Sequence, residues 1–404
     1  MLFPAVFLCL FGEVENDLRT KSENGGLPLN NNRLEQWGWA EEWNKKWIKT
    51  IESMSVEEEA ITAAYEPARI IADYGQKFGV ITAEGRRFAS LTGKFRQRQE
   101  AGGMKPGVGD FIVITSHGAQ DDVKVHEVLE RSSIIARQAA GNETKEQIIA
   151  TNVNTLFIVC ALNKDYNVRR LERYLILAWN SGANPVIVLS KSDLNDDVAF
   201  RLAETDEIAP GVPVIAVSAK LGIGKDLLDQ YACPGQTVAL IGSSGSGKST
   251  IINWLTGQEE QITQEVRDDD SRGRHTTTHR ELFLLPDGGV IIDTPGMREL
   301  SIWDDGDGIA RTFDDIEQWA KQCYFDDCQH GREKGCAVRE AIETGTVDAS
   351  RLTNYHKMQR EIAYQLRKEA EVSKRNSKST KNAPRRKKRG EWRAEVEEDF
   401  GASK

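Results

Sequence analysis

The spacing of apolar residues changes along the chain and predicts three kinds of structure. Between residues 66 and 140, short alternating stretches are separated by Gly-rich turns, about every eight to twelve residues. This pattern is typical of a small closed β-barrel, and five such strands fit an OB-fold. From residue 145 to 303, continuous apolar runs such as "TLFIVCAL", "NPVIVLS" and "VPVIAVS" predict the buried strands of an α/β domain. After residue 304 the pattern is mostly helical.

The segment "VALIGSSGSGKSTIINWL" carries the strongest chemical signal. It predicts a buried strand, a Gly-rich turn and a helix that begins near Lys248, which is the context that a phosphate-binding loop requires. Backbone N–H groups of such a loop point at phosphate oxygens, the Lys248 ammonium neutralises the β- and γ-phosphates, and the Ser249 hydroxyl binds Mg²⁺. The expected phosphate-binding residues are Gly242, Ser243, Ser244, Gly245, Ser246, Gly247, Lys248, Ser249 and Thr250.

A second phosphate-side motif lies further along the chain. "GGVIIDTPGMREL" predicts a strand that ends at Asp293, followed by a turn at Gly296. We expect Asp293 to bind the Mg²⁺ shell through water and the Gly296 N–H to meet the γ-phosphate. The polar segment "SRGRHTTTHREL" between the two motifs is expected to act as a switch, in which Thr277 completes the coordination of Mg²⁺ together with Ser249 and Asp293.

The residues expected to read a guanine base come before the phosphate loop. Two apolar strands run into the short motifs "SKSD" and "SAK". The carboxylate of Asp193 is expected to accept both N1–H and N2–H of guanine, and it repels the N1 lone pair of adenine. Lys191 would lie along the base, and the Ala219 N–H would donate to guanine O6. The expected base-binding residues are Ser190, Lys191, Asp193, Ser218, Ala219 and Lys220.

This order of motifs predicts a circularly permuted GTPase domain. Base reading comes first along the chain, phosphate binding second and the switches last. A doubly wound sheet tolerates such a permutation when its former termini lie close together, because the ligand crevice at the strand ends is unchanged.

Three cysteines and one histidine form a compact set near the end of the apolar pattern. The spacing Cys323-x₄-Cys328-x-His330-x₅-Cys336 brings four soft ligands together within turns, as tetrahedral Zn²⁺ demands. We expect a structural zinc ion here, since the protein fills all four positions. A disulfide with a spare thiol is the alternative, which a reducing compartment disfavours.

These motifs resemble, in kind and in order, those of the RsgA/YjeQ proteins, the circularly permuted GTPases of bacterial small-subunit ribosome biogenesis. The resemblance covers roughly residues 66 to 370 and includes the zinc ligands. It implies a GTP hydrolase that acts in late maturation of the small (30S) subunit, binds its rRNA and uses the GTP/GDP state to control its release. One departure is Ser190, where most such proteins have an Asn that ties this loop to the phosphate loop; a serine hydroxyl offers one hydrogen bond instead.

The expected organisation is multidomain. An N-terminal extension of unassigned role (1–62) contains a helical stretch with four tryptophans, and its first residues suggest a misplaced start codon. The other expected parts are an RNA-binding OB-fold barrel (66–140), the permuted GTPase domain (145–303), a mostly helical zinc-binding domain (304–368) and a basic disordered tail (369–404). In the barrel, we expect four aromatic residues to belong to the core: Tyr74, Phe78, Phe88 and Phe95. We expect six basic residues to contact RNA: Lys77, Arg86, Arg87, Lys94, Arg96 and Arg98.

Charge and composition agree with a cytoplasmic RNA-binding protein. The net charge is −9, but residues 364–393 contain twelve Lys or Arg against three Glu. Such an acidic body with a basic tail favours an RNA partner. No stretch approaches the roughly 20 apolar residues of a membrane span, so we expect no membrane partner. The expected partners are GTP or GDP and the small ribosomal subunit, and we expect the protein to be a monomer.

The position that usually carries the water-activating residue of a GTPase holds an unsuitable side chain here. Many GTPases place Gln directly after the D-x-x-G turn, where this chain has Met297. His275 in the switch is the expected catalytic residue, because an imidazole orients water, and the family resemblance points to it too. His279 is a weaker candidate. Two other functions stay open: a P-loop ATPase or kinase, and a non-catalytic RNA-binding scaffold.

Overall fold

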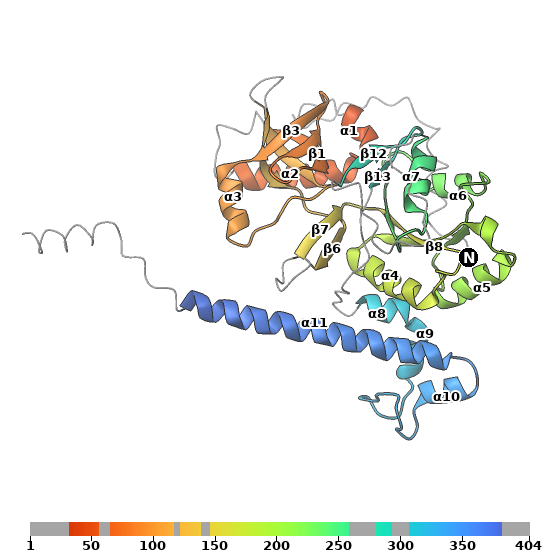
Figure 1. Ribbon diagram of the computed structural model, residues 1–404. Coiled ribbons are helices and arrows are strands. Elements are labelled where there is room, and N and C mark those ends of the chain that lie inside the picture. The colour runs from red at the N-terminus through yellow and green to blue at the C-terminus, as the bar shows by residue number, and fades with distance from the viewer. Residues whose placement is uncertain are drawn as a thin grey trace, which may run out of the picture. The chain divides into compact units, whose positions relative to one another are not determined.

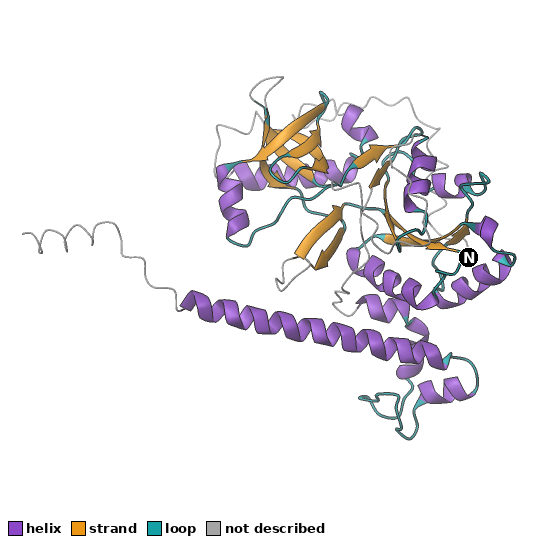
Figure 2. Cartoon of the chain, in the orientation of Figure 1, coloured by secondary structure: helices purple, strands orange, loops and turns teal. Residues whose placement is uncertain are grey.

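The computed structural model describes residues 32–55, 65–116, 122–138, 146–257, 280–292 and 307–381 (Figure 1). One compact unit ends at Met358, and a second begins at Gln359. Figure 2 shows that the large unit combines a strand-rich N-terminal part, a mixed central part and helices toward its C-terminal end. Each helix in the described part of the chain is too short or too polar to cross a lipid bilayer.

The N-terminal strands form a closed barrel with the connectivity of an OB-fold. They are β1 (Tyr65–Asp73), β2 (Phe78–Ile81), β3 (Arg86–Leu91), β4 (Phe111–Thr115) and β5 (Val123–Val128). The strands close in the order β1-β2-β3-β5-β4, and the β3–β5 pair is parallel. Helix α3 (Gly93–Glu100) lies between β3 and β4 in the chain, and the Thr92 side chain caps its N-terminus. The expected five-stranded OB-fold is confirmed.

The four barrel aromatics selected from the sequence divide into two pairs. Phe78 and Phe95 are buried, as expected for core residues. The expectation is wrong for Tyr74 and Phe88, which are 45% and 54% exposed. Their rings lie together on the outside of the barrel, with centroids 5.9 Å apart. Successive residues of a strand point to opposite faces, so Phe88 points outward because its neighbour Ala89 points into the core.

The Trp-rich segment packs against the barrel. Residues 32–55 form α1 (Asn32–Gln36) and α2 (Glu41–Ser55), so the expected helical stretch is confirmed. Trp39 and Trp43 contact the ring of Phe111 on β4, at centroid distances of 5.2 and 4.4 Å. Trp37 and Trp47 are also buried. Aromatic side chains bury large apolar areas, so these four tryptophans explain why the segment is ordered.

A two-stranded hairpin separates the barrel from the α/β domain. Its strands β6 (Ile134–Gln138) and β7 (Glu146–Thr151) pair with each other in antiparallel fashion. The sequence placed Ile134 and its neighbours in the barrel, but the barrel ends with β5 at Val128. The alternation of apolar residues identifies a strand without identifying its partner, which explains the difference.

The central sheet contains six strands. In chain order they are β8 (Thr155–Ala161), β9 (Asn184–Ser190), β10 (Val214–Ala216), β11 (Thr237–Ile241), β12 (Leu282–Leu284) and β13 (Val290–Ile292). The helices among them are α4 (Val168–Ser181), α5 (Val198–Ile208), α6 (Lys225–Asp229) and α7 (Lys248–Thr256). The order across the sheet is β10-β9-β8-β11-β13-β12, with every pair parallel except β12–β13.

The topology explains how the permutation preserves the site. The first three strands fill one half of the sheet and the last three the other half, so β8 and β11 lie side by side at the centre. Ligands of open α/β sheets bind at the carboxyl ends of the strands, where the chain diverges to the two halves. The crevice is the same whichever half comes first in the chain.

A fully buried arginine joins three parts of the large unit. Arg69 of β1 donates to the carbonyl oxygens of Trp37 and Gly109 and, at 2.9 Å, to the Thr237 hydroxyl at the start of β11. Its guanidinium also lies over the ring of Phe111. Burial lowers the pKa of Arg69 to about 9, so the side chain stays charged at neutral pH. The Trp-rich segment, the barrel and the phosphate-loop strand therefore share one buried cation.

The C-terminal region is helical. It contains α8 (Asp307–Thr312), α9 (Asp314–Ala320), α10 (Ala337–Glu343) and α11 (Ala349–Lys381). Gly308 lets α8 lie against α4, since a Cβ at this position would meet the backbone oxygen of Ile176 at 2.7 Å. Helix α11 continues through Lys381, so the first residues of the tail that was expected to be disordered from residue 369 are helical. Lys, Arg and Glu favour helices, which accounts for the extension; residues 382–404 lie outside the described residues.

We expect Arg69→Lys to lower the free energy of unfolding. A compact ammonium cannot reach all three acceptors that the guanidinium fork spans, and each buried acceptor left without a donor costs about 1–3 kcal/mol. Urea unfolding followed by tryptophan fluorescence measures this, because four of the nine tryptophans lie at the joint. Arg96→Lys, at an exposed site on α3, is the control; equal stability of the two variants would refute the role of Arg69.

Candidate functional site

The phosphate loop lies between β11 and α7, as the sequence predicts. Gly242 and Gly247 adopt positive φ angles of 153° and 97°. A Cβ on Gly242 would lie 2.2 Å from the backbone oxygen of Val159 in β8, so only glycine fits there. The Lys248 ammonium donates to the carbonyl oxygens of Gly242 and Ser243, at 2.8 and 2.7 Å. These bonds hold a cation against the phosphate loop at the N-terminus of α7. A cation beside a helix N-terminus is an arrangement that binds anions.

The base-side motifs meet at the carboxyl ends of β9 and β10. The Ser218 hydroxyl donates to the Asp193 carboxylate at 2.6 Å and accepts the Leu221 N–H at 3.2 Å. Lys191 has a positive φ of 56° and begins the turn that presents Asp193. Ala219 is half-buried and Lys220 is exposed. One carboxylate oxygen of Asp193 is thus fixed by Ser218, which orients the side chain.

Two hydrogen bonds connect the base side with the phosphate side. The Ser190 hydroxyl donates to the backbone oxygen of Ser246 at 2.5 Å, and the Lys191 ammonium donates to that of Gly245 at 2.8 Å. Both bonds cross the end of β8, the strand between β9 and β11. The single hydroxyl bond expected of Ser190 is therefore present, and the structure brings together two motifs that the sequence separates by more than fifty residues.

An acidic residue that the sequence analysis did not single out also reaches the phosphate loop. Asp165, in the turn between β8 and α4, accepts a hydrogen bond from the Ser243 hydroxyl. The Arg170 guanidinium binds both oxygens of Asp165, each at 2.8 Å. The available signal was its position: β8 is buried along its whole length, and polar residues follow it at the edge where ligands bind.

The predicted switch residues belong to residues 258–279 and 293–306, which the structure does not describe. His275, Thr277, His279, Asp293, Gly296 and Met297 lie outside the described residues. The preceding strand β13 is parallel to β11, beside the phosphate loop strand, and ends at Ile292. Asp293 follows β13 directly in the sequence.

The four predicted metal ligands converge. The ligand atoms of Cys323, Cys328, His330 and Cys336 lie within 4.8 Å of one another. The Cys323 and Cys336 sulfurs are 3.9 Å apart, and each lies 3.6 Å from Nδ1 of His330. Burial lowers the pKa of His330, which favours the neutral ring that binds metals. The cluster can hold one metal ion. His356, not selected from the sequence, stacks its ring parallel to that of His330.

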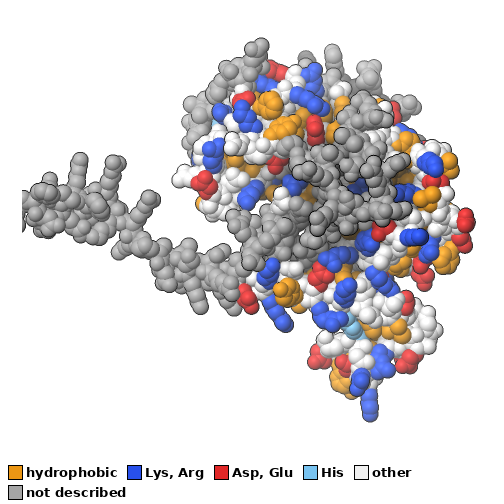
Figure 3. Space-filling view, in the orientation of Figure 1, with side chains coloured by type: hydrophobic (Ala, Val, Ile, Leu, Met, Phe, Trp, Pro, Cys, Tyr) orange, Lys and Arg blue, Asp and Glu red, His pale blue; other side chains and the backbone are white. Residues whose placement is uncertain are grey.

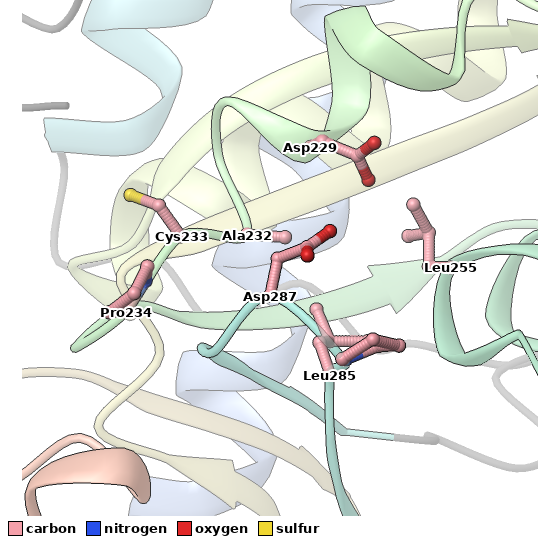
Figure 4. A pocket seen from close by; sticks show the side chains of 8 residues that line it. Asp229, Ala232, Cys233, Pro234, Leu255, Leu285 and Asp287 are labelled. Carbon is pink, nitrogen blue, oxygen red and sulfur yellow. The ribbon is translucent and has the colours of Figure 1, made fainter. Parts of the chain in front are cut away.

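A small pocket lies beside the amino end of β11, opposite to the phosphate loop. It has a volume of about 170 Å³, and its lining comes from the segments before β11, at the end of α7 and between β12 and β13 (Figure 4). The lining residues are Asp229, Ala232, Cys233, Pro234, Leu255, Leu285, Pro286 and Asp287. Two carboxylates repel phosphate, and the phosphate loop is at the opposite end of β11, so this pocket is separate from the nucleotide site.

Comparison with known proteins agrees with this geometry. A family model described as RsgA GTPase matches residues 128–303. The chain is 50% identical to small ribosomal subunit biogenesis GTPase RsgA 2 of Lactiplantibacillus plantarum, over 74% of this chain and 83% of that protein. It is 46% identical to the RsgA 1 protein of Oceanobacillus iheyensis, over 75% of this chain and 86% of that protein.

Solved structures show the same fold. The structure of YjeQ from Thermotoga maritima matches with a TM-score of 0.57 and 26% identity, over 74% of this chain and 99% of that one. YloQ, described as a circularly permuted GTPase, matches with a TM-score of 0.54 and 22% identity, over 74% and 96%. The expected permuted GTPase fold is confirmed. A model of ABC transporters also matches residues 228–382, a range that contains the phosphate loop shared by many nucleotide-binding proteins.

We expect Asp193→Asn to weaken GTP binding and to favour xanthosine nucleotides. The amide keeps one acceptor but introduces a donor facing the guanine N–H groups. Loss of a charged bidentate contact lowers affinity about ten- to a hundredfold. Fluorescent nucleotide titrations measure the change, with Asp196→Asn, an exposed acid nearby, as the control. Unchanged GTP affinity in Asp193→Asn would rule out this residue as the base reader.

Proposed function

The chain belongs to the RsgA GTPase family, and from this premise we propose that it hydrolyses GTP during late maturation of the small (30S) ribosomal subunit. The protein binds rRNA and uses its GTP or GDP state to control its release. The observation that carries the proposal is the contact between the base-reading loop and the phosphate loop. Ser190 and Lys191 donate hydrogen bonds to the backbone of the phosphate loop. The relatives are named for small ribosomal subunit biogenesis.

We assign the nucleotide contacts by chemistry. Lys248 and the backbone N–H groups of residues 242–250 bind the phosphates, and Asp193 and Ala219 select guanine. Ser249, Thr277 and Asp293 hold Mg²⁺, which shields the phosphate charge when it is bound. His275 positions the attacking water, because Met297 lacks the hydrogen-bonding groups of the usual Gln.

An ATPase or kinase function is less well supported. The ABC transporter match includes the phosphate loop but excludes residues 190–193 and 218–220, where the base is read. Asp193 disfavours adenine, and its fixed orientation supports a base-reading role. A non-catalytic scaffold explains neither the Lys248 contacts nor the retained Asp193.

We propose that the Cys₃His cluster holds one structural zinc ion. Tetrahedral zinc with bonds of about 2.3 Å to sulfur and about 2.0 Å to nitrogen separates its ligands by about 3.8 Å (S–S) and about 3.5 Å (S–N). The observed separations of 3.9 and 3.6 Å fit these values. The ion would fix the loops that carry the four ligands.

The outer face of the barrel supports an RNA contact. Of the six basic residues expected to contact RNA, Lys77, Arg86, Arg87 and Arg98 form ion pairs with carboxylates. Acidic and basic side chains also intermingle on the face shown in Figure 3. The exposed Tyr74–Phe88 pair is therefore stronger support for RNA binding than the basic residues are, because unpaired bases stack on such rings. Gly79 lies opposite Phe88 and leaves room for the Tyr74 ring.

Metal analysis tests the zinc assignment. We expect one equivalent of zinc in protein purified without chelators, and loss of zinc with local unfolding around the ligand loops in Cys328→Ser. GDP binding should survive, because the nucleotide site uses other elements. Cys233→Ser, outside the cluster, is the matched control and should retain zinc. Zinc-free wild-type protein would contradict the assignment.

RNA binding tests the aromatic pair. We expect the double variant Tyr74→Ala/Phe88→Ala to bind single-stranded RNA at least about tenfold more weakly, since each stacked base contributes roughly 1–3 kcal/mol. Phe200→Ala removes an equally exposed ring on α5 and should leave RNA binding unchanged. Equal RNA affinity of the double variant and the wild type would remove the pair from the interface.

Hydrolysis and subunit sedimentation test the cycle itself. We expect His275→Ala to lower single-turnover hydrolysis by ~10²–10⁴-fold with nearly unchanged GTP affinity, and therefore to accumulate on small subunits. Lys248→Ala should lose nucleotide and subunit affinity together. His279→Ala is the control within the same segment. Wild-type turnover in His275→Ala would exclude this residue, and equal sedimentation of all variants would refute control by the nucleotide.

A further inference from the structure

The contact between Asp165 and the phosphate loop continues into helix α4. Arg170, which binds both oxygens of Asp165, belongs to the first turn of α4. The Asn167 side chain caps this turn by accepting the Arg170 N–H at 3.1 Å. The Ser243 hydroxyl is therefore tied through one carboxylate to the N-terminus of a helix.

The next turn of α4 begins with a buried carboxylate that binds the C-terminal helices. Glu172 is fully buried and accepts hydrogen bonds from Arg169, Arg351 and Asn354. Arg169 precedes Arg170 in the chain, so both networks begin on adjacent residues. A buried carboxylate with three donors holds its partners firmly, because losing one leaves a charge without compensation.

Arg351 connects Glu172 with the C-terminal region. Its side chain is nearly fully buried and binds both oxygens of Asp315 in α9, at 2.7 and 2.8 Å. It also donates to the backbone oxygens of Thr312 at the end of α8 and Ile208 at the end of α5. One guanidinium thus joins α4, α5, α8, α9 and the start of α11.

We propose that the first turn of α4 transmits the nucleotide state of the phosphate loop to the metal-binding region, with Asp165 as the positioning residue at the loop end. Nucleotide phosphates bring negative charge next to the Asp165 carboxylate and attract Arg170. The nucleotide-free and nucleotide-bound proteins therefore differ in the strength of the Ser243–Asp165 and Asp165–Arg170 bonds. A switch requires such a difference in interaction between its two states. Glu172 and Arg351 carry the resulting shift of α4 to α8 and α9.

A second route joins the same two regions and has to be separated from the first. Residues 293–306 link β13 to α8 through the chain itself. A switch that acted only through this segment would not involve Asp165 or Glu172. The inference goes beyond the proposed role in subunit maturation and needs nucleotide binding alone, so its tests use purified protein without subunits and can fail independently.

The loop end is tested by a double-mutant cycle on GDP affinity. Ser243→Ala and Asp165→Ala are each expected to change the dissociation constant about threefold or more, and the double variant should match the single variants, because all three remove one bond. Effects that multiply in the double variant would show that Asp165 does not act through Ser243, and would overturn the proposal.

The helix end is tested by hydrogen–deuterium exchange at saturating GDP. In the wild type, GDP should change amide exchange in residues 307–320 about twofold or more. Asp165→Ala and Glu172→Gln should abolish this response, whereas Asp206→Ala, an exposed acid on α5, should keep it. Glu172→Gln should still be saturated by GDP, with an affinity within about threefold of the wild type, which excludes general unfolding. A response that persists in either variant, or is absent from the wild type, overturns the proposal.

Discussion

The nucleotide site depends on the contact between the base-reading loop and the phosphate loop. These loops belong to opposite halves of the sheet, and the chain visits them in reversed order. Hydrogen bonds from Ser190 and Lys191 to the backbone of the phosphate loop join them directly. Because both acceptors on the phosphate side are backbone carbonyls, these two bonds fix the position of the loop without using its side chains or its N–H groups.

Buried arginines attach the neighbouring parts to the GTPase domain on its two sides. Arg69 links the barrel and the Trp-rich segment to β11, and Arg351 links the C-terminal helices to α4. Burying a cation costs free energy. The cost is offset where the several N–H donors of a guanidinium meet acceptors that the fold holds in place. Apolar contacts tolerate sliding, whereas these forks specify one arrangement. The two joints thus hold the barrel against β11 and the C-terminal helices against α4.

The sequence predicted those parts of the site in which chemistry is contained within a short segment. The phosphate loop, "SKSD", "SAK" and the Cys₃His set are local motifs whose backbone context is visible in the apolar pattern. Asp165, Glu172 and Arg351 were missed because their roles depend on partners far away in the chain. The exposure of Tyr74 and Phe88 and the β6–β7 pairing also depend on tertiary partners, which periodicity does not encode. The assignments of His275, Thr277, Asp293 and Gly296 stay predictions.

The central claim is that two separated halves of the chain build one site that is selective for guanine. Equilibrium binding of GDP and ADP to the wild-type protein, by displacement of a fluorescent guanine nucleotide, tests it most directly. With Asp193 held by Ser218 and the two loops joined, GDP should displace the probe at concentrations about a hundredfold or more below those of ADP. Equal displacement by the two nucleotides would contradict the account.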